Sequence, residues 1–481
     1  MRNWIRRIAA LVDRLRHRGR AMGRMGRKVT PKAPVWGLAV IWLRSSFLPS
    51  QNYLIILAVV VGVLTGYGSV GFVKFLHMMA DFARGQVASA LAIFGPAQLV
   101  LLPAIGGLMV GPLINRFAKE AKGHGVPEVM MALATRGGRI RKRVVMVKVI
   151  ASSLTIGFGG TAGREGPMVQ IGSAIGSAIG QWAGLTTRNV RTLVACGAAG
   201  GIAATFNAPI AGAMFSMEAL MGRIQTDFLL VLLTSMSSSI VARHYLGNAP
   251  AVLSPYYELA SPWELPLYFL MGLIIGLAAV LYVRLLYRSE DLFGGWKFPE
   301  YLKPAVGGLL AGLVLRFFPE VYGSGLPAIE AALFTRYSWE VLLCLFAAGM
   351  LANCATLGSG GSGGVFAPAL YMGAMLGGAF GALAHGIYPD WTATSGAYAM
   401  VGMAAFFAAA AKAPTTSILI LFEMTGDYRI MLPLMAATVG SVYLSHRLLP
   451  QSIYILKLHR RGIVYPYAEE EPGSPGESVR G

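Results

Sequence analysis

The stretch from Asn52 to Phe72 reads NYLIILAVVVGVLTGYGSVGF and contains no charged residue. A helix of ~20 residues crosses the ~30 Å hydrocarbon core of a membrane. Further apolar runs that approach this length follow at Ala97 to Phe117, Phe228 to Leu246 and Leu265 to Leu286. We therefore expect an all-α polytopic membrane protein.

Composition excludes an ordinary soluble enzyme. Of the 481 residues 55% are hydrophobic and only 13% are charged, whereas a soluble domain carries roughly 25% charged residues. The three cysteines show no CxxC spacing, so we expect neither a disulfide framework nor a metal site. The seven histidines show no HExxH-type spacing, which disfavours a membrane-embedded enzyme. No cofactor is expected.

The net charge of +19 is concentrated at the N-terminus, where residues 1–34 supply ten of these charges. A nucleic-acid-binding arm is one interpretation. Beside membrane spans, retention in the cytoplasm and contact with anionic lipid headgroups is the better one, so we expect no nucleic-acid partner. The basic loop at 136–143 and the basic residues at 457–461 should face the cytoplasm by the same rule. We therefore expect both termini to be cytoplasmic, and we expect no cleavable signal peptide.

Three short strings recur in the same order about 200 residues apart, which is typical of a transporter built from two repeats. The prolines of one pair, Pro167 and Pro368, are 201 residues apart, and those of another, Pro209 and Pro414, are 205 apart. Chance matches in Gly-rich sequence are the alternative explanation. The matched segments are Gly123 to Pro127 with Gly323 to Pro327, Gly163 to Pro167 with Gly364 to Pro368, and Asn207 to Pro209 with Lys412 to Pro414. In the third pair a glutamate follows nine residues after each proline: Glu218 after Pro209, and Glu423 after Pro414.

The repeats predict the domain organisation. We expect a basic cytoplasmic arm over 1–49, one transmembrane repeat over 50–250, a second over 251–462 and a short cytoplasmic tail over 463–481. The basic loop at 136–143 has no equally basic counterpart about 200 residues later. If one copy faces the cytoplasm and the other does not, the two repeats have inverted topology.

The recurring glycine and proline strings indicate broken helices. Glycine permits a turn and a close approach to the backbone, and proline fits the first turn of a helix. The new helix then exposes unpaired N–H groups and the positive end of its dipole, which together form an anion site. Irregular backbone survives in a bilayer only where it lines a buried cavity or a water path. Tight loops between helices are the alternative, but several such strings in a repeat favour an anion site where the broken helices meet.

These strings, together with Ser452-Ile453-Tyr454, resemble the ordered signature of the CLC family of chloride channels and proton/chloride antiporters. The resemblance spans roughly residues 50 to 462. It implies a homodimer with one pore per subunit, and 17 or 18 helices per subunit in two inverted halves whose helix N-termini point at a central chloride. It implies as partners the bilayer, chloride or a similar small anion and, in some members, protons. It also implies a location in the bacterial inner membrane.

The resemblance also assigns roles to single residues. Glu165 resembles the gating glutamate, whose carboxylate competes with chloride and swings away when it is protonated. Tyr454 resembles the tyrosine whose hydroxyl donates to the central ion. An N-terminal cap and an interfacial tyrosine are the respective alternatives. The implied chloride-binding set is His124, Gly125, Glu165, Gly166, Val365, Phe366 and Tyr454, with Val365 and Phe366 contributing backbone N–H groups.

Two positions depart from the family pattern. His124 stands where much of the family has serine. One interpretation is that its imidazole donates an N–H to the anion, which would make conduction depend on pH near the ordinary histidine pKa of ~6.5. The alternative is that the imidazole turns towards the cytoplasmic mouth of the pore. Ala219 stands where many proton-coupled members have glutamate. Two candidates could replace the missing internal proton site: the neighbouring Glu218, or a chain of water molecules.

The expected function is transport of chloride or a similar anion through a pore gated by Glu165. The loss at Ala219 favours passive, channel-like conductance; a proton/chloride antiporter with a non-standard internal proton path is the alternative. The fluoride-exporting branch is disfavoured because Glu165-Gly166-Pro167 is intact. Only 27 residues follow Tyr454, which is too short for the paired nucleotide-sensing domains of some relatives.

Overall fold

The computed structural model describes residues 50–222, 227–248, 252, 255 and 257–465. The expected basic arm over 1–49 and most of the expected tail, residues 466–481, lie outside the described residues. The first half of the described chain contains α3 (Ser50–Phe82), η1 (Ala83–Val87), α4 (Ala88–Ala90), η2 (Ala92–Ala97), α5 (Gln98–Phe117), η3 (Lys119–Ala121), α6 (Val126–Thr135), α7 (Arg143–Gly157), α8 (Glu165–Trp182), α9 (Thr187–Phe206), α10 (Pro209–Phe215), η4 (Ser216–Leu220) and α11 (Phe228–Leu246). The second half contains α12 (Glu264–Gly295), α13 (Lys303–Phe317), η5 (Pro319–Val321), α14 (Leu326–Leu333), α15 (Trp339–Gly358), α16 (Phe366–Ile387), α17 (Ser395–Ala411), α18 (Pro414–Thr425), α19 (Met431–Leu448) and α20 (Ile453–Arg460).

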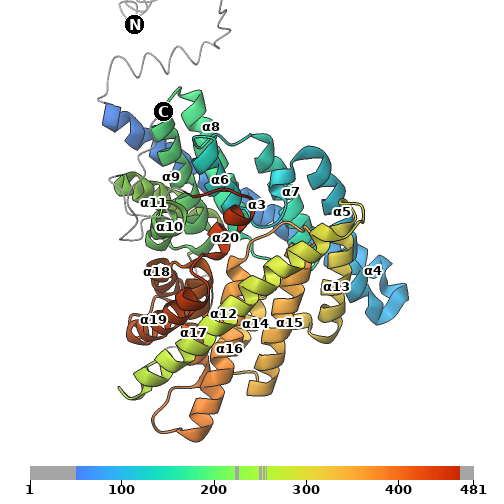
Figure 1. Ribbon diagram of the computed structural model, residues 1–481, viewed down its shortest axis with the longest axis vertical. Helices are drawn as coiled ribbons and strands as arrows, with labels where there is room; N and C mark the ends of the chain where they lie inside the picture. The colour runs from blue at the N-terminus through green and yellow to red at the C-terminus, as the bar shows by residue number, and fades with distance from the viewer. Residues whose placement is uncertain (1–49, 223–226, 249–251, 253–254, 256, 466–481) are drawn as a thin grey trace, which may run out of the picture. The chain divides into compact units, whose positions relative to one another are not determined.

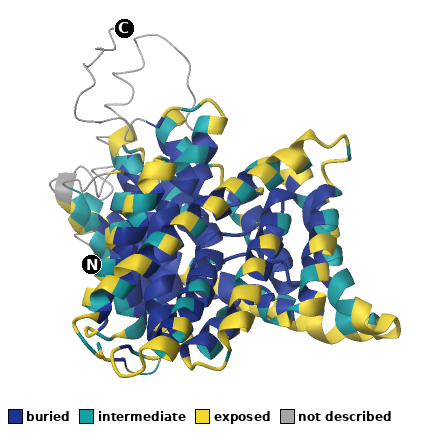
Figure 2. Ribbon diagram, turned by 60° about the horizontal axis from the view of Figure 1, so that its bottom comes forward, coloured by how far each residue is buried: buried dark blue, intermediate teal, exposed yellow. Residues whose placement is uncertain are grey.

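The prediction of an all-α membrane protein is confirmed. Six stretches of helix in the described part are long and apolar enough to cross a membrane, and the longest is Asn52–Ala90. The exposed surface of these helices is itself apolar, as at Ile240, Leu277 and Leu351, each more than half exposed. Figure 2 shows the buried residues in the interior and exposed ones on the outer faces. Such apolar outer faces are suited to contact with the hydrocarbon core of a membrane.

Glycines let the central helices approach closely. A Cβ added to Gly172 on α8 would clash with the backbone of Gly197 on α9, and the reverse holds. Gly373 on α16 and Gly402 on α17 are related in the same way. Small residues at helix contacts are the usual means by which membrane helices associate. The second pair lies about 200 residues after the first, at the spacing of the sequence repeat.

Backbone angles recur at the same spacing. Gly123 and Gly323 have φ angles of 67° and 65°. Asn207 and Lys412 have φ angles of 59° and 56°, a left-handed conformation that is uncommon outside glycine. Each of these two residues ends one helix just before a proline begins the next, at α10 and at α18. The expected breaks after Asn207 and Lys412 are therefore present.

The last helix of the described chain packs against a helix from its first half. The last helix, α20, drawn in red in Figure 1, packs against α6 from the first half and also contacts α17. Ser452 caps α20, because its hydroxyl accepts a hydrogen bond of 3.1 Å from the N–H of Ile455. The packing of α20 against α6 places Tyr454 next to the loop that precedes α6.

Candidate functional site

The glycine strings predicted from the sequence lie against one another. Gly163 and Gly364 exchange two backbone hydrogen bonds, of 2.8 Å and 2.6 Å. The N–H of Gly123 donates to the carbonyl of Gly361 at 2.9 Å, and the N–H of Ala162 donates to the carbonyl of Gly323 at 3.1 Å. Residues 123, 163, 323 and 361–364 thus form one junction inside the protein.

Several helices begin at this junction. The first helical residues of α8, α16 and α6 are Glu165, Phe366 and Val126, so the first-turn N–H groups of three broken helices lie near one place. These groups carry partial positive charge and lack partners within their own helices. The arrangement produces an anion-attracting environment without a full positive charge.

A small cavity lies at this point. Its volume is about 10 Å³, which is close to the room that one water molecule requires. Six of the seven residues expected to bind chloride line it. The complete lining is His124, Val126, Glu165, Gly166, Val169, Ile202, Phe215, Val365, Phe366 and Tyr454.

Gly125 is the expected site residue that does not line the cavity. A Cβ at this position would lie 2.6 Å from the carbonyl oxygen of Gly166 and 2.8 Å from the side chain of Gln170. Glycine is therefore needed here for close packing of the loop before α6 against α8. Four lining residues, Val126, Val169, Ile202 and Phe215, were not expected, because an apolar residue in an apolar helix carries no signal in the sequence.

Glu165 is buried, with 2% of its surface exposed. Its carboxylate accepts a hydrogen bond of 3.4 Å from the N–H of Ala367, in the first turn of α16. A Cβ on Gly163 would clash with the same carboxylate oxygen. The carboxylate thus accepts from a first-turn N–H group of α16, in space that Gly163 leaves free.

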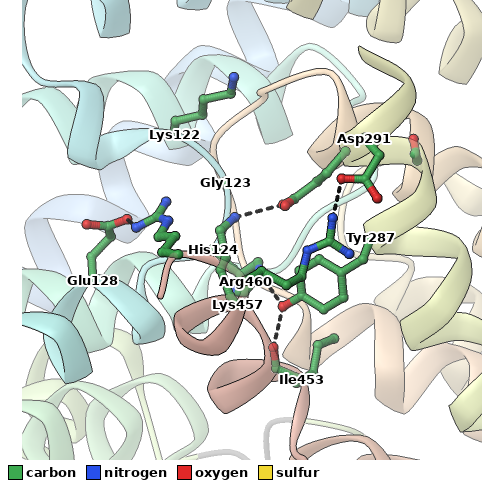
Figure 3. Close-up of polar contacts among 12 residues, drawn as sticks. Lys122, Gly123, His124, Glu128, Tyr287, Asp291, Ile453, Lys457 and Arg460 are labelled. Atoms are coloured by element: carbon green, nitrogen blue, oxygen red, sulfur yellow. Dashed lines mark hydrogen bonds and ion pairs between the residues drawn. The ribbon is translucent and has the colours of Figure 1, made fainter. Parts of the chain in front are cut away.

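His124 lies in the loop before α6 and has 1% of its surface exposed. Its ring packs near those of Tyr287 and Tyr454, with centroids 6.4 Å and 6.2 Å away. Lys148 on α7 holds the loop, since its ammonium donates to the carbonyls of Ala121 at 3.0 Å and Gly123 at 2.7 Å. Figure 3 shows His124 beside Tyr287 and Lys457. Tyr287, Lys148 and Lys457 carried no signal in the sequence that connected them with the site.

The basic residues at the end of α20, beside the site, form ion pairs with acidic residues of other helices. Lys457 contacts Glu290 at 2.7 Å, and Arg461 contacts Glu128 at 2.5 Å. Arg460 pairs with Asp291 (Figure 3). Acidic residues on α6 and α12 therefore bind the last turn of α20 and the residue after it.

Glu218 has a structural role in this fold. Its carboxylate accepts hydrogen bonds from the N–H groups of Thr415 at 3.0 Å and Thr416 at 2.7 Å, and from the hydroxyl of Thr416 at 2.6 Å. These donors belong to the first turn of α18. Glu423 does the same for α10, with bonds of 3.1 Å and 2.7 Å from Ile210 and Ala211.

Ala219 is buried in the apolar core, with 9% of its surface exposed. Its methyl side chain has no group that can bind a proton. Among the described residues there is no group of three His, Cys, Asp or Glu side chains that could hold a metal ion.

Comparison with known proteins identifies the family. The model of the voltage-gated chloride channel family matches residues 106–446. The chain belongs to this family, the CLC chloride channels and transporters, which are not enzymes.

Individual relatives span most of the chain. A ClcB-like protein of Ralstonia nicotianae, whose name places it among chloride channel proteins, is 35% identical over 79% of this chain and 90% of its own. The H⁺/Cl⁻ exchange transporter ClcA of Vibrio cholerae is 33% identical over 84% of this chain and 88% of its own. The crystal structure of a slow cyanobacterial Cl⁻/H⁺ antiporter has a TM-score of 0.78 and 28% identity, over 88% of this chain and all of the other.

Proposed function

We propose that this protein exchanges chloride for protons across a bacterial membrane, through the cavity that Glu165 closes. The observation that carries this proposal is the Glu165 carboxylate, which is buried in the cavity wall and bonded to the first turn of α16. Two of the three relatives described above are exchangers of chloride and protons by name. This weighs against the passive conductance that the loss at Ala219 favoured.

The geometry supports a simple gating step. The ionised carboxylate and a chloride ion seek the same N–H donors, so only one of them occupies these donors at a time. A proton on Glu165 removes its charge and its advantage over the anion. The carboxyl group then leaves the donors to chloride, and its proton crosses with the group. One residue thus connects anion binding to proton binding.

Passive anion conductance is the second candidate. It is favoured by Ala219, which cannot carry a proton, and by Glu218, whose two oxygens accept three hydrogen bonds from α18. A proton path to Glu165 must therefore use other groups. Glu218 as a substitute remains a prediction that this hydrogen bonding disfavours.

The architecture that we propose has two inverted repeats, over 50–250 and 251–462, with both termini in the cytoplasm. Reciprocal contacts support a two-fold relation. Gly163 and Gly364, 201 residues apart, exchange equivalent backbone bonds. Thr161 N–H donates to the Thr356 hydroxyl at 3.2 Å, and Ser362 N–H donates to the Thr155 hydroxyl at 3.1 Å. These four residues form two pairs with the same spacing of 201.

We also propose that two copies associate as a homodimer, each with its own pore. This proposal rests on the family resemblance alone. Single-molecule photobleaching of labelled protein in liposomes at high dilution tests it: two bleaching steps are expected, and a single step would contradict it.

Reconstituted protein tests the transport function. Liposomes loaded with high chloride are diluted into low chloride, and chloride efflux and external pH are recorded together for the wild type and for Glu165→Ala. Exchange predicts that efflux takes protons into the liposomes and turns the outside alkaline without a proton ionophore, and that Glu165→Ala conducts chloride without this pH change. Efflux that needs only valinomycin, with no linked pH change in the wild type, would establish passive conductance instead. Absence of chloride flux in both proteins would overturn both candidates.

A further inference from the structure

His124 is a buried titratable side chain with an unused polar atom. The ring lines the same cavity as Glu165 and Tyr454. Its Nδ1 atom has no hydrogen-bond partner and is inaccessible. A buried polar atom without a partner costs free energy, so its retention at the wall of an ion-binding cavity points to a partner that comes and goes.

The neighbouring tyrosine determines which ring nitrogen carries the proton. Tyr287 on α12 donates its only hydroxyl proton to the carbonyl of Ile453. Its oxygen can then only accept from His124 Nε2, at 3.5 Å. Neutral imidazole carries one N–H, which this contact assigns to Nε2. Nδ1 is therefore a bare lone pair in the neutral ring, and becomes a donor only when the ring takes up a second proton.

The charges around the ring set the condition for that second proton. Lys457 on α20, Lys148 on α7 and Arg461 after α20 all lie close enough to repel a positive charge on His124. Lys457 and Arg461 are partly neutralised by Glu290 and Glu128. In the described part of the chain, the ring also lies beside Tyr287 on α12 and Tyr454 on α20, and it shares its cavity with Glu165 on α8.

An anion in the cavity reverses this repulsion. It adds a negative charge beside the ring and offers an acceptor for a new Nδ1–H. When the cavity holds no anion, burial opposes the imidazolium, and the three nearby basic side chains add to this effect. Protonation of His124 and occupation of the cavity by an anion should therefore favour each other, as reciprocal binding equilibria do.

We propose that His124 is the internal proton site of this protein: it takes up a proton from the cytoplasmic side when an anion enters the cavity and passes it through the cavity to Glu165. This rests on the proposed exchange function. The proton binds to Nδ1, moves to the Glu165 carboxylate across a cavity with room for about one water molecule, and leaves neutral imidazole behind. His124 thereby replaces the carboxyl group that Ala219 lacks.

Flux measurements on His124→Ser test the relay. Serine keeps a hydroxyl that can donate to the anion, but it cannot take up an additional proton at neutral pH. We expect chloride flux to persist, which shows a folded pore, and proton flux to fall by about 10²-fold, the usual contribution of a positioned proton-transfer group. The matched control is His77→Ser on the exposed surface of α3, which should leave both fluxes unchanged. Wild-type exchange with an unchanged proton-to-chloride ratio in His124→Ser would overturn the relay and leave the exchange function standing.

An equilibrium measurement removes Glu165 from the comparison. Chloride is added to Glu165→Gln protein in weakly buffered detergent solution, and proton uptake is followed with a pH indicator, with gluconate as the control anion. We expect chloride-dependent uptake that approaches one proton per subunit, because imidazole binds one proton. The double variant Glu165→Gln/His124→Ser should take up none. Equal uptake by both proteins, or no uptake by either, would overturn the assignment to His124.

Discussion

Single residues decide how the cavity works, and Gly163 is the simplest case. A Cβ at this position would meet the Glu165 carboxylate and would lie 3.1 Å from the N–H nitrogen of Ala367. Overpacking of this kind costs about 1–3 kcal/mol if nothing moves. Of the two neighbours, the Glu165 carboxylate can move aside more easily than the backbone of Ala367, because it ends a flexible side chain.

We therefore predict that Gly163→Ala displaces the Glu165 carboxylate, which is the gate in the function proposed above. Chloride flux should become less dependent on pH and proton flux should fall, as for Glu165→Ala, when both are measured in liposomes. Gly71→Ala on α3, where an added Cβ meets nothing within 4 Å, is the matched control and should behave as wild type. Normal gating in Gly163→Ala would show that the carboxylate does not need this space.

The resemblance to the CLC family identified most of the cavity lining but missed part of its apolar wall. It assigned Glu165, His124 and Tyr454 by their places in the matching motifs, and all three line the cavity. Ile202 and Phe215 line it too, yet nothing separates them from other core residues. The tautomer of His124 depends on Tyr287, 163 residues away, which no local pattern reveals.

At the scale of helices, two short elements cap each other. Glu218 follows α10 and caps α18, whereas Glu423 lies on α18 and caps α10. The sequence predicted that both glutamates are repeat equivalents, nine residues after a proline. It could not predict that each serves the other helix, because these contacts join residues about 200 positions apart, and only the packing of the helices decides which of them meet.

This exchange predicts the order of two stability changes. Glu218→Ala and Glu423→Ala should each lower the free energy of unfolding by about 2–3 kcal/mol, since hydrogen bonds to a charged group are lost and first-turn N–H groups of α18 or α10 lose their acceptor. Glu218→Ala should cost more, because Glu218 accepts three bonds and Glu423 two. Denaturant midpoints in detergent measure this, with the exposed Asp390→Asn as the control.

The glutamine variants separate capping from proton transfer. Glu218→Gln keeps one acceptor oxygen, so the pore should remain folded and chloride flux should persist. If Glu218 only caps α18, the proton-to-chloride ratio stays at the wild-type value. Loss of proton flux with normal chloride flux would instead make Glu218 the proton carrier and contradict the role given to His124.

At the scale of the whole molecule, charged residues gather where loops join the helices. Lys303 donates to the carboxylate of Glu300 at 2.5 Å, and Lys122 approaches it at 3.2 Å. The hydrogen bond from Lys303, aided by the charge of Lys122, holds the pKa of Glu300 below its ordinary value despite partial burial. Partial burial alone would raise the pKa of Glu120, but the hydrogen bond from Arg141 and the charges of Arg141 and Arg136 lower it overall.

Both shifts predict a loss of stability in acid. A carboxyl group with a lowered pKa in the folded state stabilises the protein fully above its unfolded pKa, near 4.5, and this contribution disappears as the pH falls through the folded pKa. Melting temperatures of wild type and of the double variant Glu120→Gln/Glu300→Gln should therefore differ at pH 7 and converge below about pH 4. The difference at pH 7 should be modest, about 1 kcal/mol or less for each pair, because one partner of each pair is more than half exposed and solvent screens its charge. A difference that grows in acid would mean that these carboxylates bind protons more tightly in the folded state, the reverse of what their basic neighbours impose.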